Sequence, residues 1–136
     1  MHKILPRYYY FIDSFNKDHI KNLDKNIAII FRKYTKKLNI NELIEIKKFC
    51  KSSNRKFFLS NNVKLALQLD LDGVYLPSFN KSNRINIYSK KNKFLVLGSA
   101  HNLKEIKIKE NQNVDVLFLA SLFNKKKTFL GLQRFK

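Results

Sequence analysis

Six short apolar runs recur along the chain at fairly regular intervals. The runs are Tyr8–Ile12, Ile27–Phe31, Phe57–Leu59, Gly73–Leu76, Phe94–Leu97 and Val116–Ala120. Each is too short for a helix, is rich in β-branched or aromatic residues, and is apolar at successive positions rather than at alternate ones. That pattern is typical of strands that are buried on both faces of a parallel sheet.

The segments between the runs predict helices where they are long enough. The clearest is Asn39 to Lys51, which carries a broad apolar stripe. Asn39 is a good N-cap, and Glu42 stands three residues later, where its carboxylate can reach back to the N–H of the cap. The same Asn-x-x-Glu spacing returns at Asn102 and Glu105, so a second capped helix is expected after the fifth run.

Two further segments are less regular. Val63 to Leu69 predicts a shorter helix, and the polar stretch from Phe79 to Lys93 predicts a loop or a weak helix with a short Ile85–Tyr88 segment. Strand and helix thus alternate with a repeat of about 20 residues, which is the pattern of βαβ crossovers. We expect one α/β domain over residues 1–136 with about six parallel strands.

The composition excludes some classes of protein. With 44% hydrophobic and 13% aromatic residues the chain can bury a core, so wholesale disorder is excluded. A single cysteine, Cys50, cannot form an internal disulfide, which favours a reducing, cytoplasmic location. No apolar run approaches the roughly 18 residues that a bilayer crossing needs, so we expect no membrane partner.

The charge is high: 28 Lys and Arg against 10 Asp and Glu give a net +18. Such a charge is compatible with a nucleic-acid partner. It is spread over both halves of the chain, however, and 23 of the 28 basic residues are Lys, whereas phosphate recognition usually favours the planar fork of Arg. The charge therefore favours a lysine-rich surface over a nucleic-acid footprint, and a basic nucleic-acid-binding domain is kept as an alternative.

Polar residues end or follow every apolar run, at the end where parallel α/β folds place their ligand sites. They are Asp13, Ser14, Arg32, Ser60, Asn61, Asn62, Tyr75, Ser78, Ser99, His101, Ser121 and Lys125–Lys127. Cations, hydroxyls and amides are the groups that hold phosphates. No glycine-rich phosphate loop is present, and the histidines and the cysteine lack the spacing of metal ligands. His101 is a candidate acid–base group or, alternatively, a capping residue of the helix near Asn102.

Three segments together resemble the thiamine-phosphate synthase and TenI-like thiazole tautomerase family of (β/α) barrels. FFLSNNVKLALQLDLDGVYLP is similar to the family's strand, Asn-Asp-Arg, helix and Ala-Asp-Gly-Val-His-Leu; VLGSAHNLKE is similar to its Gly-x-Ser-x-His segment. VDVLFLASLFNKKKTFLGLQRF is similar to its last matching strand, phosphate loop and Leu-Gly-Leu, and IIFRKYTKK matches at Arg32. Asp72-Gly73-Val74 and Ser99-Ala100-His101 carry most of the resemblance.

The resemblance implies an incomplete TIM-barrel-like fold and a ligand class. The synthase joins a hydroxymethylpyrimidine pyrophosphate to a thiazole phosphate, so the partners implied are phosphorylated or pyrophosphorylated thiamine precursors. Arg32 would hold pyrophosphate and Ser99 would face the pyrimidine. Phosphate or substrate would also contact Ser60, Asn61, Lys125, Lys126, Lys127 and Thr128.

The chain departs from the family where the family binds magnesium. The resemblance places its two metal carboxylates at Asn61 and Asn80, and its Gln and Lys beside the arginine at Ile30 and Tyr34. Neutral amides bind Mg²⁺ far more weakly than carboxylates, so a magnesium cofactor is expected only if synthase activity is retained. The tautomerase relatives need no metal and use a histidine at the position of His101, which makes proton transfer the easier chemistry.

The length is short for this fold. A closed eight-stranded barrel takes roughly 200 residues or more, whereas this chain has 136 and stops after Leu130-Gly131-Leu132, where a sixth helix is expected. An open sheet would leave its first and sixth strands as apolar edges. We therefore expect self-association or a partner subunit over those edges, and a truncated, non-catalytic phosphate-ligand-binding subunit stands as a further alternative.

Overall fold

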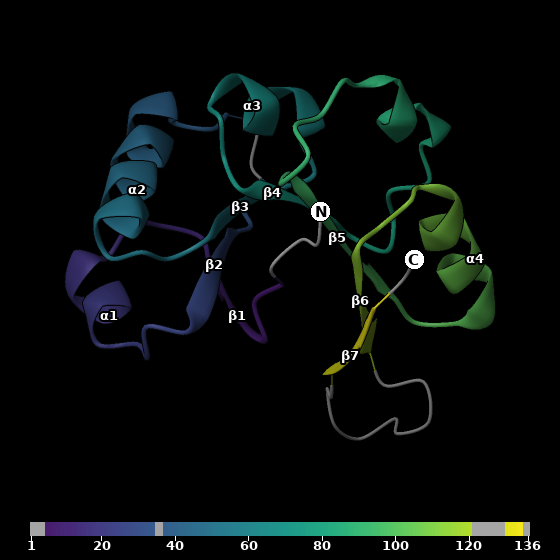
Figure 1. Cartoon of the computed structure of the whole chain (residues 1–136), viewed down its shortest axis with the longest axis horizontal. Coiled ribbons are helices and arrows are strands. Elements are labelled where there is room, and N and C mark those ends of the chain that lie inside the picture. The colour runs from purple at the N-terminus through teal and green to yellow at the C-terminus, as the bar shows by residue number, and fades with distance from the viewer. Residues whose placement is uncertain (1–4, 35–36, 121–129, 135–136) are drawn as a thin grey trace.

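The protein, described by a computed structural model over residues 5–34, 37–120 and 130–134, folds into one curved sheet with helices along its outer side (Figure 1). The strands lie in the sheet in chain order: β1 (Tyr8–Ile12), β2 (Ile27–Phe31), β3 (Phe57–Ser60), β4 (Gly73–Leu76), β5 (Leu95–Ala100), β6 (Val116–Ala120) and β7 (Leu130–Arg134). The first six are parallel and form a half-barrel, as predicted.

The helices are α1 (Lys17–Lys21), α2 (Ile40–Ser52), α3 (Val63–Gln68), the 3₁₀-helix η1 (Asn83–Ile87) and α4 (Leu103–Asn111). Each α-helix begins after an asparagine whose side-chain oxygen accepts a backbone N–H of the first turn; these are Asn16, Asn39, Asn62 and Asn102. Repeated caps of this kind, each typically worth about 1 kcal/mol, fix where the helices start.

The sheet has an apolar layer on each face. The outer layer packs against the helices and includes Ile29, Leu59 and Val96. The inner layer fills the concave face, where the ring of Tyr9 on β1 lies 5.0 Å, centroid to centroid, from the ring of Phe118 on β6. The first and sixth strands therefore touch through their side chains although four strands separate them in the sheet.

Arg55 ties the start of β3 to the segment before β2. Its guanidinium donates hydrogen bonds of 2.6–3.0 Å to four main-chain carbonyls, those of Ile20, Leu23, Asp24 and Ile27. Only 6% of Arg55 is exposed, so this cation is used inside the fold and is not part of the charged surface.

Three details differ from the sequence predictions. Residues 130–134 form strand β7, antiparallel to β6, where a sixth helix was expected, so β6 is covered by β7, and β1 and β7 are the two edge strands of the described sheet. Glu42 does not bond its own cap; its carboxylate accepts the N–H of Phe15, 3.0 Å away. The five-residue helix α1 was not predicted, because Ile20 is its one buried side chain.

Self-association over β1 stays a prediction; Tyr8 and Tyr10, on that strand, are exposed. None of the described helices has the length and apolar character that a bilayer crossing requires.

Candidate functional site

Polar side chains gather on the concave side at the carboxyl ends of the parallel strands. Side chains alternate along a strand, so residues in step with the inner-layer residues Ile30, Phe58 and Leu97 point to the concave side. Arg32, Ser60 and Ser99 stand two residues beyond these positions. The fold therefore brings three of the predicted ligand-binding residues to one side of one edge.

Two tyrosine–serine pairs shape this edge. The hydroxyls of Tyr75 and Ser99 share a hydrogen bond of 2.7 Å, and those of Tyr34 and Ser60 share one of 3.0 Å. Burial raises the pKa of Tyr75, and the hydrogen bond with Ser99 only partly opposes that rise. Tyr75 is therefore a neutral hydroxyl at physiological pH, able to donate as well as accept.

Arg32 lies over an aromatic ring. Its guanidinium carbon is 4.1 Å from the centroid of Phe11, and Phe11 in turn lies edge-on to Tyr75 at 5.2 Å. A cation over an aromatic face is held electrostatically by the ring. Arg32 is exposed, and it makes no ion pair with a carboxylate in the part of the chain that the structure describes. It borders a cavity of about 350 Å³ that also contacts Asp13 and Ser14.

A second cavity, of about 510 Å³, lies between the segments that follow β2, β3 and β4. The rings of Tyr34 and Phe79 line it and contact each other edge to face, with centroids 5.5 Å apart, and Ser60 and Asn61 also line it. Tyr34 is 53% exposed and Phe79 58% exposed. Two exposed aromatic rings next to hydroxyl and amide groups suit a flat, polar ring system.

Asn61 and Asn80 bond to each other. The side-chain N–H of Asn80 donates to the side-chain oxygen of Asn61 at 2.7 Å. Asn61 has a left-handed backbone (φ 61°), which asparagine tolerates, and its N–H donates to the carbonyl of Tyr75 at 2.7 Å. The segment after β3 is thus linked directly to the segment after β4.

These residues do not fit a magnesium ion. The Asn61 oxygen that a cation would need already accepts from Asn80, and the Asn80 oxygen accepts from the N–H of Ser82 at 2.9 Å. No group of three His, Cys, Asp or Glu residues suited to a metal occurs within residues 5–34, 37–120 and 130–134. Magnesium prefers one or two carboxylates, and neither amide supplies that charge.

A buried lysine, Lys109, adds a positive charge beneath the Asn61–Asn80 pair. The Lys109 ammonium, from α4, donates to the main-chain carbonyl of Asn80 at 2.8 Å, and Gln112 donates to the same carbonyl at 3.0 Å. Burial lowers the pKa of Lys109 to about 8, partly offset by Glu105. The lysine stem passes over Gly98, where a Cβ would lie 2.8 Å from it.

His101 lies at the start of α4 and is paired with a carboxylate. Its Nδ1 is 3.2 Å from Glu105 Oε1, which also accepts the backbone N–H of His101 at 2.6 Å. The His101 side chain is 56% exposed. The N-cap of α4 is Asn102, whose side-chain oxygen accepts the N–H of Glu105, so His101 precedes the cap and is not the capping residue. The pairing with Glu105 leaves the other ring nitrogen of His101, Nε2, turned away.

The remaining predicted ligands, Lys125, Lys126, Lys127 and Thr128, lie outside the described residues. Lys109, Phe11 and Phe79 were not among the site residues predicted from the sequence. Lys109 reads there as an ordinary helix-surface lysine, and Phe11 as an ordinary core residue. Only the two-residue alternation along β1 could have placed Phe11 under Arg32.

Comparison with known proteins gave a family match and a similar solved structure. The family model described as thiamine monophosphate synthase matches residues 21–130. A solved structure of thiamine phosphate pyrophosphorylase from Pyrococcus furiosus is similar, with a TM-score of 0.53 and 25% sequence identity. The match covers 71% of this chain and 48% of that one, so it extends over about half of the archaeal protein. No curated protein is similar enough to this chain to count as a match.

The amide pair predicts the behaviour of a carboxylate variant. We expect the double variant N61D/N80D to bind Mn²⁺ at least tenfold more tightly than the native chain, because two carboxylates restore the ligand charge. Electron paramagnetic resonance titration of free Mn²⁺ measures this. N54D/N113D is the matched control, since Asn54 and Asn113 are exposed and also left-handed. Equal Mn²⁺ affinity in the native chain and N61D/N80D would contradict our conclusion.

Lys109 predicts a pH-dependent stability. Its pKa is about 8 in the fold, below the 10.5 of an unperturbed lysine. Between these values the unfolded chain binds more protons, so stability rises with pH there. From pH 7 to 9.5 we expect the unfolding free energy of the native chain to gain about 2 kcal/mol relative to Lys109→Met. Denaturant unfolding measures it, and the exposed Lys104→Met is the control. A pH-independent difference would show that Lys109 is solvated.

Proposed function

This chain belongs to the thiamine monophosphate synthase family, and we propose that it binds a phosphorylated, heteroaromatic thiamine precursor at the carboxyl edge of its sheet without a divalent cation. The observation that carries the proposal is the placement of an exposed guanidinium, Arg32, and an exposed pair of aromatic rings, Tyr34 and Phe79, around one edge of the half-barrel.

The guanidinium and the aromatic rings are proposed to contact different parts of the ligand. A guanidinium binds phosphate oxygens in a bidentate manner, and Arg32 is held over Phe11 and forms no ion pair with a described carboxylate. The rings of Tyr34 and Phe79 offer apolar contact to a flat heterocycle, while Ser60 and Ser99 supply hydroxyls for its polar edge. Lys125–Lys127 and Thr128 are proposed to add phosphate contacts.

The full synthase reaction has weaker support. Loss of pyrophosphate requires charge stabilisation of a leaving group that carries several negative charges. The Asn61–Asn80 pair offers no carboxylate for a metal, and the cation that the geometry orients at this edge is Arg32, held over the ring of Phe11. We therefore favour ligand binding over thiamine phosphate synthesis as the function of this chain. We expect the binding to take place in the cytoplasm.

Arg32 predicts how ligand binding responds to mutation. Isothermal titration with thiazole phosphate in the presence of a chelator is expected to show saturable binding. Arg32→Gln is expected to weaken that binding at least tenfold, because a charge-assisted contact is lost. Arg84→Gln, at an exposed arginine on η1, is the matched control. Addition of both synthase substrates with Mg²⁺ is expected to give no thiamine phosphate above background. Binding that requires Mg²⁺, or equal effects of the two variants, would overturn the proposal.

A second candidate function rests on His101. A carboxylate accepts hydrogen bonds and cannot donate them, so Glu105 favours the tautomer with the proton on Nδ1. Nε2 is then left with a free lone pair, as a general base needs. This supports proton transfer on a bound thiazole phosphate, the chemistry of the family's tautomerase branch.

The His101–Glu105 pair predicts a separation of turnover from binding. If the chain interconverts thiazole tautomers, His101→Ala is expected to abolish turnover while binding of thiazole phosphate changes less than twofold. Glu105→Gln is expected to lower kcat with little change in binding, because an amide can donate to Nδ1 as well as accept from it and no longer fixes the tautomer. Proton exchange into the thiazole, followed by NMR, measures both. Unchanged proton exchange in His101→Ala would show that His101 takes no part in proton transfer.

A further inference from the structure

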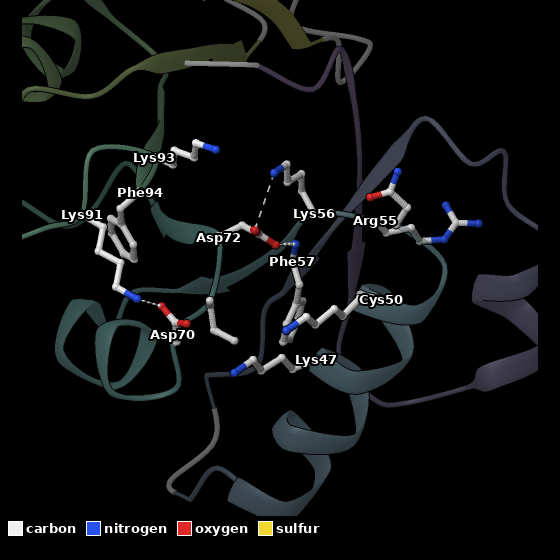
Figure 2. Close-up of a pocket in the computed structure, with 13 residues that line it drawn as sticks. Lys47, Cys50, Arg55, Lys56, Phe57, Asp70, Asp72, Lys91, Lys93 and Phe94 are labelled. Carbon is white, nitrogen blue, oxygen red and sulfur yellow. Dashed lines mark hydrogen bonds and ion pairs between the residues drawn. The ribbon is translucent and has the colours of Figure 1, made fainter. Parts of the chain in front are cut away.

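A third cavity lies at the opposite, amino-terminal edge of the sheet. It has a volume of about 290 Å³ and is enclosed by the end of α2, the segment before β3, the turn before β4 and the loop before β5. Figure 2 shows basic side chains from these segments arranged around Asp70 and Asp72. We propose that this cavity binds a small multivalent anion of the pyrophosphate or phosphate-ester class.

Five lysines from three separate segments line the cavity. Lys47 and Lys51 come from α2, Lys56 from the segment before β3, and Lys91 and Lys93 from the loop before β5. Against them stand two carboxylates, Asp70 and Asp72. The cavity therefore carries a local excess of positive charge, even when Arg55 is left out.

Both carboxylates already have interaction partners. Asp70 pairs with Lys91 at 2.6 Å, and Asp72 lies 3.8 Å from Lys56. Asp72 also accepts the backbone N–H of Phe57 at 2.7 Å, so its position is fixed by the start of β3. The Asp72 carboxylate thus has a structural role, because it holds the start of β3.

Three lysines are left over. Lys47, Lys51 and Lys93 form no ion pair with any carboxylate of the described residues. Lys47 and Lys51 nevertheless lie close enough to Asp70 to help lower its pKa, behind the larger effect of Lys91. Three ammonium groups without partners around one cavity match an anion that carries more than one negative charge.

The floor of the cavity adds no competing negative charge. It includes Phe57, Leu71 and Cys50, and burial raises the pKa of the Cys50 thiol to about 12, so the thiol is neutral. Arg55 faces away from the cavity (Figure 2), toward the carbonyls that it binds.

A lysine-rich surface alone would not produce this arrangement. The carbonyl end of α2 favours a nearby cation, but its partial charge of about half a unit offsets less than one of the five ammonium groups. A concave site with cations on several sides also differs from the open basic stripe that nucleic-acid backbones require. The geometry therefore favours a small anion.

The experiment titrates inorganic pyrophosphate into the full chain near physiological salt. K47Q/K51Q/K93Q is expected to weaken binding at least tenfold. K48Q/K64Q/K104Q is expected to change it less than twofold, because it removes the same net charge from exposed lysines outside the cavity. Arg32→Gln is expected to retain the binding, which separates this site from the proposed precursor site.

Backbone amide shifts of the native chain give a second measurement that needs no variant. Pyrophosphate is expected to move the amides of residues 50–57, 70–72 and 91–94 more than those at the carboxyl edge. If both triple variants weaken pyrophosphate binding equally, the binding depends only on overall charge. If only Arg32→Gln loses the binding, pyrophosphate binds at the carboxyl edge instead. Absence of saturable binding, or displacement by an oligonucleotide at equal phosphate concentration, would also overturn the proposal.

Discussion

An open sheet of parallel strands buries its concave face only if side chains from its two ends meet in the middle. Here aromatic rings bridge that distance: Tyr9 on β1 contacts Phe118 on β6, and Phe118 lies 6.1 Å from Tyr75 on β4. Smaller aliphatic side chains would leave a gap, and a gap in a core forfeits contacts on every surface that lines it. The candidate site sits on this layer, because Phe11 supports Arg32 and Tyr75 positions Ser99.

The link between the segments that follow β3 and β4 is made by amide side chains. Asn61 and Asn80 hold two neighbouring segments together, and Lys109 and Gln112 bind the second of these segments to α4 from behind. A carboxylate pair would repel itself there unless a cation lay between the two groups. With amides the link needs no ion, and the geometry of the edge is independent of metal concentration.

The sequence was most informative where local physics decides the structure. Continuous apolar runs located all six parallel strands, and the asparagine caps located the starts of α2 and α4. It was least informative where a side chain acts at long range. Glu42 bonds Phe15, 27 residues away, and Tyr34 bonds Ser60, 26 residues away. Neither partner can be identified from the spacing of residues in the sequence. Each contact forms only when the βαβ crossovers bring the strands side by side in the sheet.

Net charge and local charge have different consequences in this molecule. The overall +18 attracts any anion weakly and is screened within about 8–10 Å at physiological salt. Selectivity must come from how individual cations are held. Arg32 rests on an aromatic ring, and the same edge carries a cavity lined by exposed rings, so the carboxyl edge can discriminate by the shape of the ligand. The lysines at the amino edge are flexible point charges from separate segments, which discriminate by charge. The two edges therefore suit two chemically different anions.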